Sequence, residues 1–80
     1  MKAKIHVALK KTVLDPQGQT IHHAVQTLGY QGIEDIRQGK YFEIQLNDGL
    51  SHEEAAHIMD KLAREVLSNP VIEEYWVELE

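Results

Sequence analysis

The sequence predicts an α+β domain of the ferredoxin-like order β-α-β-β-α-β, with an antiparallel sheet and two helices on one face. Apolar residues alternate with polar ones near both ends of the chain, as in half-buried strands, and recur at helical spacing in two segments between them. The charges are also sorted, with lysines near the start and glutamates at the end. An antiparallel pairing of the first and last strands would join opposite charges: Lys2 and Lys4 with Glu78 and Glu80, and Lys10 and Lys11 with Glu73 and Glu74.

The length of 80 residues predicts one domain, residues 1–80, with a thin hydrophobic core. Small domains commonly gain stability from disulfides, metals or oligomerisation, and the chain contains no cysteine. Disulfides and most zinc sites are therefore excluded. Oligomerisation remains, and we expect at least a dimer.

The first predicted strand covers residues 3–9, where the apolar side chains of Ala3, Ile5, Val7 and Leu9 alternate with polar ones. The stretch LDPQG then ends the strand, since Pro16 lacks a backbone donor and Gly18 relaxes the chain. A helix follows with one apolar face, and Gly29 ends it. This face comprises Ile21, Ala24, Val25 and Leu28.

Residues 33–47 predict two short strands around a turn at Gln38 and Gly39, with a positive φ at Gly39. A single bent strand is the alternative. Within the segment, Phe42, Ile44 and Leu46 share one face, and Tyr41, Glu43 and Gln45 share the other.

The second helix begins at a capping box formed by Ser51 and Glu54, and Pro70 follows its end. The final strand directs Tyr75, Val77 and Leu79 to one face, so Trp76 lies among glutamates on the other. A large aromatic residue on a charged outward face is typical of an interface anchor. We therefore expect Trp76 to be buried in an oligomer or a complex.

The net charge of −5 argues against a nucleic-acid partner, because phosphate binding normally requires a basic face. Lys4 and His6 interrupt the apolar residues near the start, which argues against a signal peptide, and no run is long enough to span a membrane. The absence of cysteine fits a reducing compartment. We therefore expect a cytoplasmic protein that does not bind membranes.

The motifs predict no catalytic, cofactor-binding or metal-binding residue. The stretch LDPQGQT lacks the second glycine and the lysine of a phosphate-binding loop. Asp15 has no histidine or second carboxylate tied to it by sequence, so a turn-forming role is favoured. His22 and His23 point about 100° apart on a helix and cannot face one metal. No serine lies in a nucleophile motif.

Arg37, Gly39 and Lys40 form a basic turn in an acidic chain. Two cations on one hairpin could contact an anion or the carboxylate of a partner. A solvated hairpin tip is the other interpretation, because exposed loops are often charged without a specific role.

Three separated segments resemble one family: LKKTVLDPQGQTI (9–21), IRQGKYFEI (36–44) and LSNPVIEEY (67–75). Together they are similar to the PurS family, the small subunit of phosphoribosylformylglycinamidine synthase. The resemblance implies a glutamine-dependent, ATP-consuming ligase of purine biosynthesis that converts formylglycinamide ribonucleotide to formylglycinamidine ribonucleotide. It implies that a large synthetase subunit carries ATP and magnesium, that a glutaminase subunit releases ammonia, and that the small, non-catalytic subunit joins them and supports ammonia transfer.

The resemblance also implies that LDPQG is a joint and a contact surface rather than a catalytic loop. The family positions carried onto this chain are candidates for partner contact or for shaping the fold: Lys10, Leu14, Asp15, Pro16, Gly18, Arg37, Gly39, Lys40, Asn69, Pro70, Val71 and Ile72.

Two other classes share the predicted element order. An ACT-like regulatory domain that binds a small molecule has a turn similar to LDPQG, but NPVIEEY would then be unexplained. An acylphosphatase-like enzyme would need an arginine in the first loop, and residues 10–19 contain none.

Overall fold

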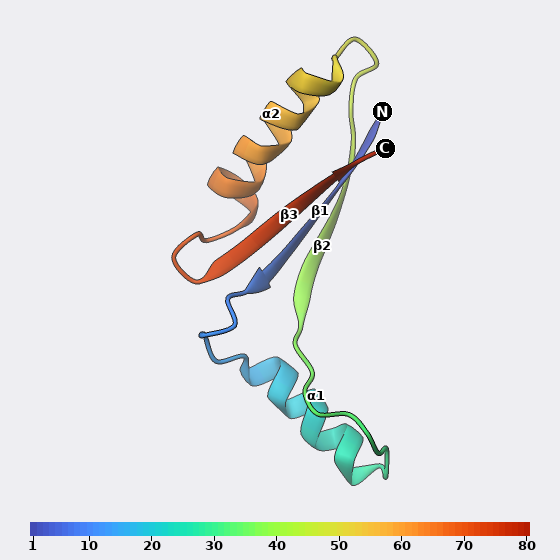
Figure 1. Cartoon of the computed structure of the whole chain (residues 1–80), viewed down its shortest axis with the longest axis vertical. Helices are drawn as coiled ribbons and strands as arrows, with labels where there is room; N and C mark the ends of the chain where they lie inside the picture. The colour runs from blue at the N-terminus through green and yellow to red at the C-terminus, as the bar shows by residue number, and fades with distance from the viewer.

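The computed structural model describes all 80 residues as a three-stranded antiparallel sheet with two helices (Figure 1). The sheet has the order β2-β1-β3, so the first strand is central. The elements in chain order are β1 (Lys2–Leu9), α1 (Pro16–Thr27), β2 (Gly39–Gln45), α2 (His52–Leu62), the π-helical turn η1 (Ala63–Leu67) and β3 (Glu73–Leu79).

The predicted pairing of the first and last strands is confirmed. β1 and β3 are antiparallel, with Lys4 opposite Glu78 and His6 opposite Trp76. The Lys4 Nζ atom lies 2.8 Å from a carboxylate oxygen of Glu80, as the charge sorting predicted. Lys10 and Lys11 form no ion pair with the glutamates at the start of β3. Lys40 pairs with Glu73 instead.

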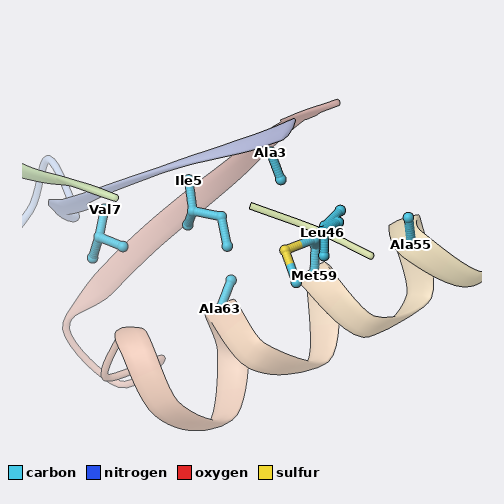
Figure 2. Packing of buried hydrophobic residues seen from close by; sticks show 7 residues of the cluster. All are labelled: Ala3, Ile5, Val7, Leu46, Ala55, Met59 and Ala63. Carbon is cyan, nitrogen blue, oxygen red and sulfur yellow. The ribbon is translucent and has the colours of Figure 1, made fainter. Parts of the chain in front are cut away.

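The hydrophobic core lies between one face of the sheet, here called the inner face, and α2 (Figure 2). The predicted capping box begins α2, because Ser51 Oγ accepts a hydrogen bond from the backbone N–H of Glu54 at 3.1 Å. Only nine residues of the chain are buried, which agrees with the thin core expected for this length. The core side chains are Ala3, Ile5, Val7, Leu46, Ala55, Met59 and Ala63.

The predicted hairpin around Gln38 and Gly39 is wrong. A single strand, β2, begins at Gly39, and residues 33–38 pair with no strand. The backbone N–H of Gln38 donates instead to the side chain of Asp15, 2.8 Å away, which holds this segment against the start of α1. Gly39 does not take a positive φ, which occurs only at Gly29 and Gly32. The alternative of one strand is therefore closer to the structure.

The placement of both helices on one face of the sheet is also wrong for α1. This helix projects beyond the end of the sheet, and residues 33–38 run back beside it (Figure 1). The molecule is elongated as a result, with a radius of gyration of 16.1 Å, against about 12 Å for a compact chain of this length. Because the contacts at the start of α1 fix its direction away from the sheet, its apolar face does not reach the core.

Candidate interaction site at the junction of sheet and helix

The three segments that resemble a known family meet where the sheet ends and α1 begins. We call this region the junction and define it as residues 9–18, 36–40 and 69–73. The Lys10 backbone N–H donates to the Ile72 carbonyl at 2.9 Å, which joins the first segment to the third. The Gln38 N–H donates to Asp15, which joins the second segment to the first. The fold therefore gathers most of the candidate residues at one place.

Asp15 is the N-cap of α1 and the central acceptor of the junction. Its carboxylate accepts hydrogen bonds from the backbone N–H groups of Gln38, at 2.8 Å, and Gly18, at 3.0 Å. These bonds, with a smaller contribution from the Arg37 charge, lower the pKa of the carboxyl group. The side chain is nearly buried, with 4% of the residue exposed. A carboxylate engaged in this way holds the joint together and is not free to act as a base.

Pro16 and Gly18 fit the same joint. Pro16 occupies the first turn of α1, where its missing N–H leaves no helical bond unmade. A Cβ atom on Gly18 would collide with the carbonyl oxygen of Ile36 and would lie 2.6 Å from an Asp15 carboxylate oxygen. Gly18 therefore allows the returning segment to approach the helix closely.

One interpretation of the sequence placed Arg37 at the solvated tip of a hairpin, and the structure does not show this. Its guanidinium group reaches back to the loop after β1, where Nη2 lies 3.0 Å from the carbonyl oxygens of Lys10 and Val13 and 3.5 Å from that of Leu9. The charge of Arg37 thus stabilises carbonyl groups within the chain. Its role in the structure is to hold the loop.

Lys40 is an accessible cation of the junction. Its side chain is 61% exposed, and Nζ lies 3.6 Å from a carboxylate oxygen of Glu73. Gly39, beside it, allows close contact between strands, since a Cβ atom there would lie 2.7 Å from the Val7 carbonyl oxygen. Both residues border a hollow of about 220 Å³ that is lined by both apolar and polar residues. Its lining comprises Val7, Ala8, Leu9, Asp15, Gln17, Gln38, Gly39, Lys40 and Glu73.

Asn69 and Pro70 form the turn that leads into β3. The Asn69 side chain accepts a hydrogen bond from the Val71 N–H at 3.1 Å. The backbone carbonyl of Asn69 accepts one from the Glu73 N–H at 2.7 Å. The turn is therefore held by its own bonds, which is a common use of asparagine. Val71, at the tip, is 79% exposed and is available for contact.

Trp76 lies on the face of the sheet opposite α2, here called the outer face, and 48% of the residue is exposed. Its ring stacks on His6 at a centroid distance of 5.0 Å and an interplanar angle of 10°. His6 in turn lies 5.1 Å from the ring of Tyr41. An aromatic row thus crosses all three strands. Sequence reasoning missed this row, because only the strand register places the three residues opposite one another.

The titratable groups away from the junction interact in pairs on the two faces of the sheet. No group of three or more His, Asp or Glu side chains is gathered to hold a metal ion. His6 Nε2 lies 3.5 Å from Glu78 but makes no hydrogen bond. The Tyr75 hydroxyl donates to Asp60 at 2.7 Å, and this bond raises the pKa of Tyr75. None of the helices has the length and apolar character needed to cross a membrane.

Comparison with known proteins gives consistent matches. A family model described as PurS, phosphoribosylformylglycinamidine (FGAM) synthase, matches residues 2–80. The phosphoribosylformylglycinamidine synthase subunit PurS of Mycobacterium leprae is 43% identical over 76 residues, which cover 95% of this chain and 91% of the relative. The corresponding subunit of Bacillus subtilis is 37% identical over 79 residues, which cover 99% of this chain and 92% of the relative.

Solved structures agree with this result. A structure of Bacillus subtilis PurS has a TM-score of 0.86 and 37% identity, and the match covers 99% of this chain and 96% of that one. A chain in a structure of PurLQS from Thermotoga maritima has a TM-score of 0.77 and 30% identity, with 96% and 93% covered. These matches favour the first resemblance over the ACT-like alternative.

Proposed function

Because the chain belongs to the PurS family and is the PurS subunit of FGAM synthase in purine biosynthesis, we propose that it is a non-catalytic bridging subunit. In this role it joins a glutaminase subunit to a large synthetase subunit and supports the transfer of ammonia between them. ATP and magnesium bind to the large subunit in this proposal. The chain itself contributes shape and contact surface.

The convergence of the family segments at the junction is the observation that carries this proposal. Asp15, Gly18 and Arg37 make contacts within the chain that fix the direction of α1 relative to the sheet. These three residues therefore serve the geometry of the chain. They do not form a nucleophile with an adjacent base, which covalent catalysis would require.

The partner contacts that we propose are the exposed groups at the rim of the junction. Lys40 supplies an accessible cation, and Pro70 and Val71 supply an exposed turn. Lys10 and Leu14 border the same region, and Leu14 is 63% exposed. Charged rim residues typically set the register and association rate of a complex at little cost to folding.

We also propose a homo-oligomer, at least a dimer, in the cytoplasm. The apolar side chains on and after α1 are only partly covered within the chain. Their burial against a second copy would stabilise both chains. The absence of cysteine supports the location. We call α1 and the segment after it, up to residue 33, the α1 arm. Its exposed apolar residues are Ile21, Leu28, Tyr30 and Ile33. Trp76 on the outer face is the contact that the sequence predicts.

The test is an assay of product formation with the matching synthetase and glutaminase subunits. The chain alone should hydrolyse neither glutamine nor ATP. Added to its partners, it should raise the glutamine-dependent rate far more than the rate with ammonium salt, because external ammonia bypasses the delivery step. Equal stimulation with both nitrogen sources would indicate a direct effect on the synthetase site. No stimulation with either source would refute the bridging role.

A further inference from the structure

The backbone of β3 has a free side from Tyr75 to Leu79, because β3 is an edge strand of the sheet. The Glu80 N–H donates to Lys2, and the Lys10 N–H donates to Ile72. Bonded pairs alternate along an antiparallel ladder, so the even-numbered residues of β3 bond to β1. The backbone groups of Tyr75, Val77 and Leu79 therefore point away from the sheet. They are available to a further strand.

The outer face beside this edge is acidic and aromatic. Glu74 and Glu78 flank Trp76 at alternate positions of β3. His6, on the central strand, covers one face of the Trp76 ring. The other ring face therefore looks toward the free edge. A cation placed there would contact the indole and would lie between the two glutamates.

The inner face beside the edge is a groove between β3 and α2. The groove has a volume of about 390 Å³. Its floor is largely apolar and one wall carries Asp60, so alternate side chains of an added strand would enter it while the others lay on the outer face. Its lining residues are His52, Ala56, Asp60, Tyr75, Val77 and Leu79.

The pairing of β1 with the other side of β3 shows which sequence suits this strand. On the outer face β1 places Lys4 opposite Glu78 and His6 opposite Trp76. On the inner face it places Ile5 opposite Val77. We propose that the free edge of β3 binds an extended segment of a partner protein that alternates basic and apolar residues, which becomes a fourth strand of the sheet.

A second copy of this chain fits the edge less well. Two β3 strands paired antiparallel about Trp76 would place Glu74 of each copy opposite Glu78 of the other, and like charges directly opposite are destabilising. The exposed edge of β2 also carries a glutamate, Glu43. Charge complementarity therefore favours a basic segment from a different protein, whichever subunit carries it.

The test uses a short peptide that alternates lysine and valine, blocked at both ends and added to the intact chain. Trp76 is the only tryptophan, so its fluorescence reports binding at this edge directly. A matched peptide carries the same side chains but is methylated on the backbone nitrogens that face β3. The first protein variant is Val77→Pro, which removes an outward N–H but leaves the bonds between β3 and β1 intact. The second is the double variant Glu74→Lys/Glu78→Lys. The control is Glu43→Lys at the opposite edge.

We expect saturable binding that changes the Trp76 emission. Methylation of the peptide or Val77→Pro should weaken it at least about tenfold, and the double charge reversal on the order of tenfold, while Glu43→Lys changes it less than about twofold. Circular dichroism checks that each variant is folded, and the methylated peptide tests strand pairing without any change to the protein.

Three results would overturn the inference. Equal binding of the methylated peptide would show attraction by charge alone. An equal effect of Glu43→Lys would show that the edge is not selective. Dissociation of a homo-oligomer by the peptide would show that a second copy occupies this edge.

Discussion

The Asp15 carboxylate accepts a hydrogen bond from the Gln38 backbone N–H at 2.8 Å, across 23 positions of sequence. This bond ties the start of α1 to the segment that returns from it, just before β2 begins. It therefore sets the direction in which α1 leaves the sheet. The consequences can be tested one residue at a time.

Replacement of Asp15 should weaken the junction. Asp15→Ala removes the acceptor for the N–H groups of Gly18 and Gln38, which loses a helix cap and leaves a nearly buried donor without a partner. We expect the melting temperature to fall by several degrees. Asp35→Ala is the matched control, since that carboxylate is exposed and accepts only from its neighbour Ile36. Equal melting of the two variants would contradict the role of Asp15.

The contribution of Asp15 should depend on pH in one direction. Its pKa is lowered in the folded chain from a usual value of 3.8, so the ionised form is the one that stabilises the fold. Its contribution is complete above about pH 5 and is lost as the pH falls through the usual pKa toward the folded value. The free energies of unfolding of the native chain and of Asp15→Asn, measured by urea denaturation, should converge as the pH falls. A difference that stays constant down to pH 3 would count against this assignment.

Gly18 and Gly39 should resist replacement because of close contacts and not because of φ. Alanine at either position would press a Cβ atom against a backbone carbonyl oxygen, of Ile36 or Val7 respectively. We expect each change to lower the free energy of unfolding by about 1–3 kcal/mol. Gly49→Ala is the control, because the nearest atom to its Cβ would lie 3.6 Å away. Denaturant titration compares the free energies of unfolding of the three variants. An unchanged free energy for Gly39→Ala would show that β1 and β2 can separate there.

Arg37 and Lys40 should differ although both are cations of one segment. Arg37→Gln loses the contacts to the loop carbonyls and should cost about 1–2 kcal/mol of unfolding free energy. Lys40→Glu should leave stability nearly unchanged and reduce the glutamine-dependent stimulation of the partners. Thermal melting and the rate assay separate the two effects. Full stimulation by Lys40→Glu would remove that residue from the proposed contact.

The exposed apolar side of the α1 arm should hold the oligomer together. Ile21 and Leu28 are 42% and 75% exposed, and Ile21→Ser/Leu28→Ser should shift the mass measured by light scattering toward the monomer. Trp76→Ala is the comparison variant. Dissociation by Trp76→Ala alone would assign the contact to the outer face of the sheet, as the sequence predicts. A monomeric native chain would exclude both contacts.

The sequence by itself determined the features that depend on local period and charge. The alternation of Ala3, Ile5 and Val7 identified β1 and its buried face. The spacing of Ser51 and Glu54 identified the start of α2. The sorting of lysines and glutamates placed β3 beside β1, because oppositely charged residues on neighbouring strands attract. These signals lie within single elements or between two strands of known direction.

Only the tertiary structure decided where α1 lies and what Arg37 contacts. Periodicity identifies an apolar face of a helix but does not say what covers it, so it could not show that α1 leaves the sheet. The missing fourth strand follows from the bond between Asp15 and Gln38, and the position of Arg37 from carbonyl groups more than twenty positions away. Such bonds depend on loop geometry in space. That geometry leaves no periodic pattern in the sequence.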